Sequence, residues 1–251
     1  MNNMKYSENN TAKYYDKIYK KWIKKDYTEY ECNLIEKYLP KNGKLLDVGC
    51  GSGRHAKYFY DKGYKVVGVE PVEYFVNKLK SEKPSLKIFK GYFNNFKKKE
   101  KFDVIISMWN TFHQLAMNEK EALFIIKKIK SLLKRNGVII FSLSPGEKFK
   151  IKDYNFSHEE NIDGKKYCLD WKIINSDKDT LTVTSLEHIK VYNEEDELID
   201  DVKAHIKQRY WKERDLIKFA KKLSLKLKII PPFPNTHNSH YIFIKEKSKQ
   251  K

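Results

Sequence analysis

Residues 45–55 read LLDVGCGSGRH, and this stretch decides the fold that the sequence predicts. An apolar run ends here, and Gly49, Gly51 and Gly53 then alternate with other residues. Glycine lets a ligand approach the main chain closely, and a turn of this kind leads into the N-terminus of the next helix. The spacing is not the G-x-G-x-x-G of dinucleotide sites. We therefore expect either a turn that binds a ligand without a pyrophosphate or a tight turn that binds nothing.

Short apolar runs and helical stretches alternate on both sides of this motif. The predicted strands are 45–48, 65–69, 86–89, 104–108 and 138–143, and the predicted helices are 54–61, 73–80 and 119–133. Strands that are apolar along their whole length are typical of a parallel sheet covered by helices on both faces. The sequence therefore predicts a Rossmann-like, doubly wound α/β fold, in which ligands bind at the carboxyl ends of the strands.

The rhythm changes after Pro145. Residues 166–210 contain no convincing helix, and apolar and polar residues alternate there, which predicts three antiparallel strands. A helix at 213–223 and strands at 225–230 and 241–245 then complete a mostly parallel sheet of seven strands. The alternating segment is thus an antiparallel β insertion before the last helix.

Three parts of the chain follow from this pattern. Residues 1–149 hold the N-terminal helices and the first half of the doubly wound domain, 150–211 form the insertion, which we expect to act as a lid, and 212–251 complete the domain. Aromatic side chains such as Tyr15 and Trp22 share one face of the N-terminal helical stretch.

The composition excludes several classes of protein. The 251 residues include 40% hydrophobic side chains, which suffices for a packed core, and no apolar run approaches the ~18 residues of a membrane-spanning helix. The three cysteines lie far apart, so we expect neither a disulfide framework nor a metal site. The N-terminus lacks the apolar core of a signal peptide. We expect a cytoplasmic protein with no membrane partner.

The formal net charge of +18 suggests a nucleic-acid partner. Against this reading, only four of the 51 basic residues are arginine, the residue that suits bidentate recognition of phosphates and bases. The lysines are spread along the chain and fit a solvated surface. A nucleic-acid partner stays open and is not favoured.

A second feature indicates what the glycine turn binds. Glu70 ends the strand that follows the turn. A carboxylate at that edge of the sheet accepts two hydrogen bonds from a ribose diol, each worth about 1.5–3 kcal/mol. An exposed glutamate at a strand end is the alternative. Together the turn and Glu70 indicate an adenosine-type ligand without a pyrophosphate.

The stretch LLDVGCGSGRHAKYFYDKGYKVVGVEPVEYFVNKLK resembles the cofactor-binding half of class I S-adenosylmethionine-dependent methyltransferases. The resemblance implies S-adenosylmethionine as the cofactor, with Asp47 and the glycine turn around its amino-acid part and ribose, and with Glu70 on the ribose hydroxyls. Arg54 and His55 follow the turn, either as the cation that meets the methionine carboxylate or as ordinary first-turn residues. The cofactor-binding residues that we expect are Tyr15, Trp22, Asp47, Gly49, Cys50, Gly51, Arg54, His55, Glu70, Pro71, Tyr92, Phe93, Met108 and Trp109.

Two later segments are similar to the same family. KFDVIISMWNTFHQL resembles its fourth strand and the loop after it, which implies that Met108 and Trp109 flank the cofactor, and LLKRNGVIIFSLSP resembles its fifth strand. Many members place an acidic residue near the adenine after the third strand, whereas this chain has KGYFNNF. Here either Tyr92 or Phe93 stacks on the adenine, or backbone groups bind it.

A narrower resemblance concerns the acceptor. YYDKIY before the glycine motif, MWNTFHQL after the fourth strand and the antiparallel insertion are together similar to small-molecule N-methyltransferases of the amino-sugar type. The resemblance implies two catalytic residues that face the acceptor amine. These are Tyr15, with Tyr14 and Tyr19 as competitors, and His113, which would act as a general base. The alternative for the tyrosines is ordinary packing of an amphipathic helix, and the alternative for His113 is a hydrogen-bonded histidine in a loop.

The sequence thus predicts an enzyme that transfers a methyl group to a small-molecule acceptor, with an amine nitrogen as the favoured target. His205, Lys207 and Arg209 share one face of a predicted strand, which would suit an anionic acceptor such as a nucleotide-linked sugar. The alternatives are an RNA methyltransferase and a non-catalytic protein that binds S-adenosylmethionine. A monomer and a homodimer are both compatible with the sequence.

Overall fold

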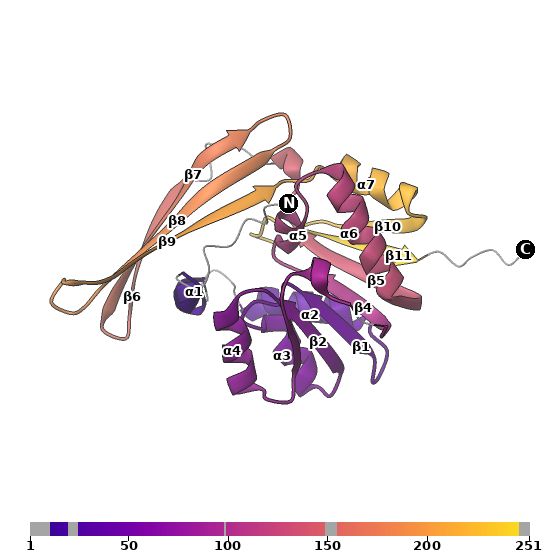
Figure 1. Cartoon of the computed structure of the whole chain (residues 1–251), viewed down its shortest axis with the longest axis horizontal. Helices are drawn as coiled ribbons and strands as arrows, with labels where there is room; N and C mark the ends of the chain where they lie inside the picture. The colour runs from indigo at the N-terminus through magenta and orange to yellow at the C-terminus, as the bar shows by residue number, and fades with distance from the viewer. Residues whose placement is uncertain (1–10, 20–24, 98, 149–154, 246–251) are drawn as a thin grey trace, which may run out of the picture.

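Seven strands form the central sheet, in the order β10-β11-β5-β4-β1-β2-β3 (Figure 1). The computed structural model describes residues 11–19, 25–97, 99–148 and 155–245. The strands are β1 (Lys44–Val48), β2 (Lys65–Glu70), β3 (Lys87–Lys90), β4 (Phe102–Ser107), β5 (Leu133–Leu143), β10 (Leu225–Ile230) and β11 (Ser239–Lys245). Strand β11 runs antiparallel to both neighbours, and the other pairs are parallel. The predicted fold class is confirmed, and its strand order reverses between β1 and β4, where open α/β sheets bind ligands.

Helices cover both faces of this sheet because its strands are apolar on both sides. Helices α2 (Lys25–Glu36), α3 (Arg54–Asp61) and α4 (Glu73–Glu82) lie on one face, where Ile35, Phe59 and Leu79 pack on the strands. Helices α5 (Thr111–Leu115), α6 (Glu119–Leu132) and α7 (Glu213–Lys222) lie on the other, where Phe112 and Phe219 are fully buried. The two apolar layers hold the carboxyl ends of β1, β2 and β4 in fixed positions.

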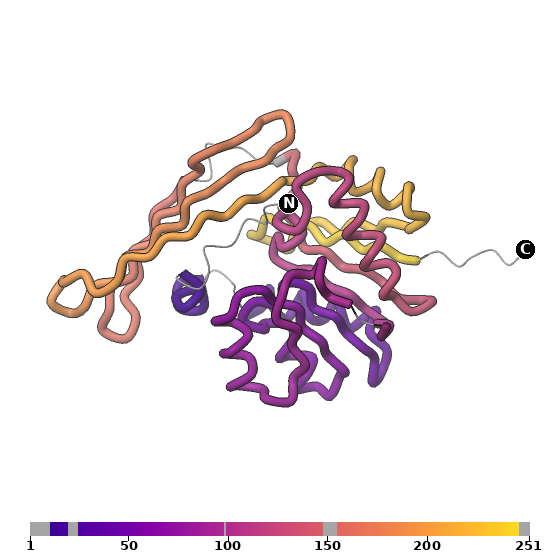
Figure 2. The backbone as a smooth tube through the Cα atoms, in the orientation of Figure 1, coloured from indigo at the N-terminus to yellow at the C-terminus, as the bar shows by residue number. Residues whose placement is uncertain are grey.

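The insertion is a separate, long and twisted sheet that projects away from the domain (Figure 2). It contains four antiparallel strands, β6 (Phe156–Ile162), β7 (Lys165–Asp177), β8 (Thr182–Tyr192) and β9 (Leu198–Arg209). We call these four strands the lid. The prediction of three strands was wrong by one, because β6 is largely polar and exposed and has no apolar alternation. The missed signal is the two-residue turn Asp163-Gly164, both at positive φ, which is a strong hairpin signature.

Helix α1 (Ala12–Tyr19) lies between the lid and the domain (Figure 1). Ile18 and Tyr19 pack on β7 and β8 of the lid, so this helix belongs to the lid's own small core. Tyr15 meets the ring of Phe75 on α4 edge-on, which connects α1 to the domain as well. Trp22, predicted on the same helical face, lies outside the described residues.

Strand β5 begins at Leu133, five residues before its predicted start at Val138, because Leu133 already pairs with Phe102 across an irregularity in the ladder.

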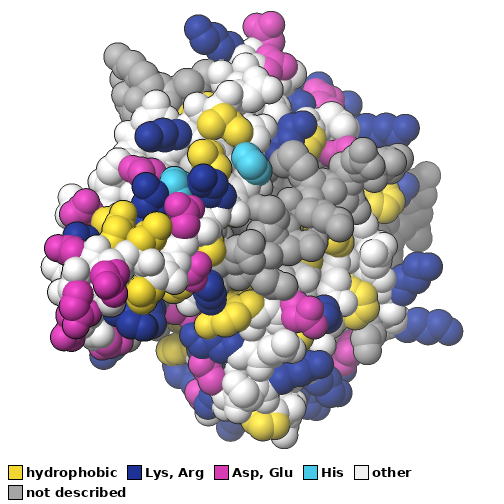
Figure 3. Space-filling view, turned by 60° about the vertical axis from the view of Figure 1, so that its left-hand side comes forward, with side chains coloured by type: hydrophobic (Ala, Val, Ile, Leu, Met, Phe, Trp, Pro, Cys, Tyr) yellow, Lys and Arg dark blue, Asp and Glu magenta, His cyan; other side chains and the backbone are white. Residues whose placement is uncertain are grey.

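The charged side chains on the face in Figure 3 fit the predicted solvated surface. Lysine and arginine side chains are scattered over this face, and acidic side chains gather at the left of the view. In the part of the chain that the structure describes, no helix has the length and apolar character needed to cross a membrane.

Candidate active site

A cavity of about 1880 Å³ opens at the carboxyl ends of β1, β2 and β4 and continues beneath the lid. Most of the predicted site residues line it. They are Tyr15, Asp47, Gly49, Cys50, Gly51, Arg54, His55, Glu70, Pro71, Tyr92, Phe93, Met108 and Trp109. His113 does not line it, and Trp22 is not described. The tertiary structure therefore brings residues from five separate segments of the sequence to one cavity.

The glycine turn is fastened to the next strand through its own backbone. The Gly49 N–H donates to the Val69 carbonyl at 2.8 Å, and the Gly51 N–H donates to Glu70 Oε2 at 2.8 Å. Gly49 and Gly51 have φ of 73° and 54°, where side chains are strained. A Cβ on Gly49 would collide with Thr111 at 2.3 Å, whereas a Cβ on Gly51 would meet no atom within 4 Å and would enter the cavity.

Gly53 serves packing rather than the cavity, contrary to its predicted place beside the cofactor. It precedes α3 with φ of 84°, and a Cβ there would lie 2.2 Å from Leu79 of α4. Glycine thus lets α3 and α4 approach each other.

Two buried carboxylates face the cavity at the tips of β1 and β2. Burial raises the pKa of Asp47 to about 7 and the pKa of Glu70 to about 7. Glu70 also accepts the Val72 N–H at 2.9 Å through Oε1, so each carboxylate oxygen has one backbone donor and retains a further lone pair. This arrangement fits a ligand that brings two hydroxyl donors, such as the predicted ribose.

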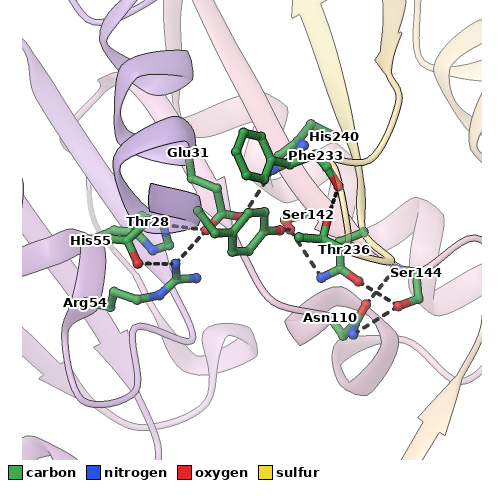
Figure 4. A network of polar contacts seen from close by, with 12 residues as sticks. Thr28, Glu31, Arg54, His55, Asn110, Ser142, Ser144, Phe233, Thr236 and His240 are labelled. Carbon is green, nitrogen blue, oxygen red and sulfur yellow. Dashed lines mark hydrogen bonds and ion pairs between the residues drawn. The ribbon is translucent and has the colours of Figure 1, made fainter. Parts of the chain in front are cut away.

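Arg54 belongs to a buried polar network that the sequence did not reveal (Figure 4). Its guanidinium donates to Glu31 Oε2 at 2.7 Å and to the Thr28 hydroxyl at 3.1 Å. It also lies over the rings of Tyr27 and Trp109, at 5.9 and 5.5 Å from their centres. Since a guanidinium has five N–H donors, Arg54 keeps donors for an anionic group in the cavity.

Glu31 is the centre of this network and is fully buried. Besides Arg54, it binds Nε2 of His55 and Nε2 of His240, each at 3.1 Å. Burial alone would raise the pKa of Glu31, but the bonds to His240 and His55 and the charge of Arg54 outweigh it and hold this pKa well below its usual range. The network joins α2, α3 and β11 at the edge of the cavity. His55 is therefore committed to Glu31, which favours the structural alternative for this residue.

The loop after β4 is strained where it meets the cavity. Trp109 and Asn110 both have positive φ, 51° and 65°, which is rare for a bulky residue such as tryptophan. The loop is held by Asn110, whose Oδ1 accepts the Ser144 N–H at 2.7 Å and whose N–H donates to the Ser142 carbonyl at 2.8 Å. Strained backbone of this kind collects at functional sites. It places Trp109 at the wall of the cavity, and its contact with the cofactor stays a prediction.

His113 is not placed to meet an acceptor, which corrects its predicted position. The ring is fully buried, its Nε2 lies 3.0 Å from the Ser144 carbonyl, and it packs against Tyr210 with ring centres 4.8 Å apart. Burial lowers its pKa to about 4. The next residue of α5, Gln114, lines the cavity instead. The helix register decides this, because successive residues of a helix point in directions about 100° apart.

The lid end of the cavity contains Glu187, which sequence reasoning did not select. Tyr15 lines this end, packed against Tyr19 with the ring planes tilted and the ring centres 4.8 Å apart, and burial raises the pKa of Tyr15 to about 12. Glu187 and Trp171, from β8 and β7, line the same end. The sequence signal for Glu187 was weak, since alternation on a strand does not tell which face is covered.

Tyr92 and Phe93, the residues predicted near the adenine, line the cavity after β3. Phe93 is 2% exposed and stacks on Phe96, so its ring belongs mainly to the core. Tyr92 is half-buried and stays the predicted partner of the adenine.

Among the described residues, no group of three histidine, cysteine, aspartate or glutamate side chains is arranged to hold a metal.

Comparison with known proteins agrees with this geometry. Residues 45–137, which contain the glycine turn, Glu70 and the loop after β4, match a family model described as a methyltransferase domain. These residues are similar to that domain, and they make up 93 of the 251 residues of the chain. This match confirms the predicted resemblance to the class I methyltransferases and supports S-adenosylmethionine as the cofactor.

The curated relatives match only part of this chain. The ubiquinone biosynthesis O-methyltransferase of Pelagibacter ubique is 32% identical over 135 residues, which are 52% of this chain and 51% of that protein. The chain spans about half the length of the curated relatives that it matches.

Two solved structures share the fold over most of the chain. DesVI of Streptomyces venezuelae is 18% identical with a TM-score of 0.81, over 95% of this chain and 100% of that one. CalS10, an amino pentose methyltransferase from Micromonospora echinaspora solved with bound S-adenosylmethionine, is 14% identical with a TM-score of 0.74, over 88% of this chain and 91% of that one. At these identities the likeness establishes the fold.

The glycine turn allows a test with a matched control. Gly51→Ala is expected to weaken binding of S-adenosylmethionine by about tenfold or more, because its Cβ enters the cavity and a positive φ strains alanine by about 1–2 kcal/mol. Gly63→Ala has the same kind of backbone, with φ of 83° and no atom within 4 Å of the added Cβ, but lies in the α3–β2 turn. Titration calorimetry should show native affinity for Gly63→Ala. Equal affinities of the two variants would remove Gly51 from the site.

Cofactor binding is expected to depend on pH near neutrality. Since the pKa values of Asp47 and Glu70 are both raised to about 7, these carboxyls take up protons as the pH falls through 7. Ribose hydroxyls donate to the ionised form of Glu70, so binding expels its proton. The affinity for S-adenosylmethionine should be constant above about pH 8. Below about pH 7 it should fall roughly tenfold per pH unit for each proton that binding expels. Calorimetry in buffers of different ionisation enthalpy counts those protons, and a flat profile would contradict the assignment.

Proposed function

We propose that the protein transfers the methyl group of S-adenosylmethionine to an amine nitrogen of a small-molecule acceptor. The observation behind this proposal is one continuous cavity with two differently built ends. The end at β1, β2 and β4 has the glycine turn and the carboxylates of Asp47 and Glu70, and the other end is roofed by α1 and the lid.

The first end suits the methyl donor. In our proposal Glu70 binds the ribose hydroxyls, Asp47 and Gly51 lie along the amino-acid part, and Arg54 receives the methionine carboxylate. Tyr92 and Trp109 flank the adenosine. When bound, S-adenosylmethionine supplies an electrophilic methyl group whose departure needs no metal and no covalent intermediate.

The rate enhancement then depends on what the chain does around the acceptor. Holding an acceptor in line with the methyl group contributes up to about 7–11 kcal/mol through orientation alone. The rings of Tyr15 and Tyr19 close this space from α1 and exclude water. Tyrosine rings also attract a nearby sulfonium by about 0.5–2 kcal/mol. Because His113 does not line the cavity, only Tyr15 of the two catalytic residues predicted from the sequence remains in our proposal.

The outer part of the cavity suits an acceptor with a negatively charged and a planar portion. Lys120 and Lys207, both exposed, line it from α6 and β9. Phe156 and Trp171 stack with nearly parallel rings, 7° apart, at its rim. We therefore propose a nucleotide-linked amino sugar as the acceptor class, a choice that the amino pentose substrate named for CalS10 supports. Arg209 is not part of this surface, because it donates to the Met117 carbonyl at 3.0 Å.

The test is transfer of a labelled methyl group to matched acceptors. The protein is incubated with methyl-labelled S-adenosylmethionine and with nucleotide-linked sugars that carry either an amine or a hydroxyl at the same carbon. Label on the amino sugar and none on its hydroxyl counterpart is the expected result. Label only on hydroxyl acceptors, or only on RNA in a parallel incubation, would overturn the proposal. Binding of the cofactor without transfer to any acceptor would favour a non-catalytic role.

A further inference from the structure

Glu187 interrupts the row of buried apolar and small side chains along one face of β8. It lies in β8, where Val183, Ser185, Ile189 and Val191 share its face and are all buried. Those four side chains are apolar or small, whereas Glu187 places a carboxylate among them with only 5% of its surface exposed. Burying a charged group costs free energy unless it is paired and hydrogen-bonded or becomes neutral through a shift of its pKa.

The described partners of Glu187 are neutral. Its Oε1 accepts a hydrogen bond from the Tyr19 hydroxyl, and the side chain of Thr11 is a second donor, both from the α1 segment. Among the residues that the structure describes, no lysine, arginine or histidine forms an ion pair with it. Burial raises the pKa of its carboxyl, and the two hydroxyl bonds only partly offset this. Within the described part of the chain, the carboxylate thus has no counter-ion.

Glu187 also lines the cavity, at the end where the acceptor would lie. Trp171 of β7 lies directly opposite Glu187 in the antiparallel β7–β8 ladder, so the two side chains are neighbours on the same face of the lid. The Trp171 Nε1 is buried and makes no hydrogen bond with any described residue. The Glu187 carboxylate, which can accept hydrogen bonds, and the Trp171 Nε1–H, which has no described partner, therefore face the same part of the cavity.

Glu187 also lies near Tyr15. Its Oε1 accepts from the Tyr19 hydroxyl, and the ring centres of Tyr19 and Tyr15 are 4.8 Å apart. Burial is the main cause of the raised pKa of Tyr15, and the charges of Glu187 and Glu70 raise it further. A group bound at Glu187 lies next to the ring that we place beside the reacting atoms.

We propose that Glu187, flanked by the rings of Tyr19 and Trp171, binds the acceptor through its ammonium group and accepts one of its protons. This inference rests on the proposed function, since it needs an amine acceptor. A carboxylate next to aromatic rings is suited to an ammonium ion, which gains a charge-assisted hydrogen bond and cation–π attraction. Trp171 Nε1 would donate to an oxygen of the same molecule.

The proton transfer balances without a further reactant. The N–H bond of the ammonium breaks, the proton forms an O–H bond with Glu187, and the electron pair stays on nitrogen. The ion pair becomes a neutral amine and a neutral carboxylic acid, which a buried site tolerates better than separated charges. The free lone pair on nitrogen is what methyl transfer requires, and the carboxyl later loses its proton to solvent.

The test compares two small probes, benzylammonium and benzyl alcohol, on the protein saturated with S-adenosylmethionine. Ligand-observed NMR titration should show the ammonium binding about tenfold or more tightly than the alcohol, as one charge-assisted hydrogen bond would give. Glu187→Gln, which keeps the shape and a partner for Tyr19, should abolish that preference. Glu187→Asp should keep part of it, and Glu195→Gln, in the exposed β8–β9 turn, should keep all of it. Equal affinities for both probes in the native protein, or an unchanged preference in Glu187→Gln, would overturn the inference.

This design separates the inference from the proposed function. Titration calorimetry should give the same affinity for S-adenosylmethionine in Glu187→Gln and in the native protein. If Glu187→Gln no longer bound S-adenosylmethionine, our account of Glu187 would be rejected. Equal methylation of an amine by Glu187→Gln and by the native protein would reject the inference and keep the proposed function. Methylation confined to hydroxyls, with the ammonium preference intact, would reject the proposed function alone.

Discussion

Glu70→Ala is expected to weaken binding of S-adenosylmethionine by about 100-fold or more. The variant loses the two charge-assisted hydrogen bonds to the ribose, each worth about 1.5–3 kcal/mol. It also loses the acceptor that holds the Gly51 and Val72 N–H groups, at 2.8 and 2.9 Å, so the glycine turn loses its link to the tip of β2. Titration calorimetry measures the affinity, and circular dichroism establishes that the variant is folded.

Glu73→Ala is the matched control for Glu70. Glu73 lies three residues further along, in the first turn of α4, and its carboxylate pairs with Lys90 on the exposed surface. An exposed pair of this kind contributes about 0–1 kcal/mol to stability and should leave cofactor affinity unchanged. If Glu70→Ala bound the cofactor as tightly as Glu73→Ala, the ribose would have to bind elsewhere.

Glu31→Ala should produce the largest loss of stability, about 3–5 kcal/mol in the free energy of unfolding. The substitution leaves Arg54 without its ion pair and His55 and His240 without their hydrogen-bond acceptor in a buried space. Urea denaturation measures the loss. Cofactor affinity should also fall, because the Arg54 guanidinium would no longer be fixed beside the cavity.

The exposed pair Glu36–Lys62 provides the comparison on the same helix. Glu36→Ala removes an ion pair of 2.6 Å at the end of α2 and should cost at most about 1 kcal/mol. The pKa of Glu31 is held well below its usual range, so its stabilising contribution is present above about pH 4.5 and is lost as the pH falls through the lowered pKa. Equal losses for the two variants, or a stability of Glu31→Ala as sensitive to acid as that of the native protein, would show that the network contributes little.

That the residues proposed for the methyl donor line one cavity could be predicted because the determinants of their positions are local. The glycine turn follows directly after β1, and Glu70 ends the next strand, so a few residues of sequence define both positions. Parallel strands then bring their carboxyl ends together, and this rule alone places Asp47, Gly51 and Glu70 at one edge of the sheet. The family match over residues 45–137 covers this same region.

The prediction was wrong where a side chain's direction depends on register. MWNTFHQL marked the loop after β4 correctly, but whether His113 or Gln114 reaches the cavity depends on where α5 begins. That start is set by the left-handed residues Trp109 and Asn110. Asn110 is held there by Ser144, which lies at the end of another strand. Such a contact between distant segments leaves no periodic signal in the sequence.

The sequence by itself determined the doubly wound fold, the position of the glycine turn and Glu70 at one edge of the sheet, and the presence of an antiparallel insertion, because strand periodicity and turn residues act over short distances. The tertiary structure alone decided that Glu31 fixes Arg54, that His113 is buried, and that Glu187 faces the cavity. Each of these depends on which face of one element is covered by another, with partners more than 20 residues away along the chain. Burial, rather than residue type, makes of those side chains a polar network, a packing residue and a carboxylate at the cavity wall.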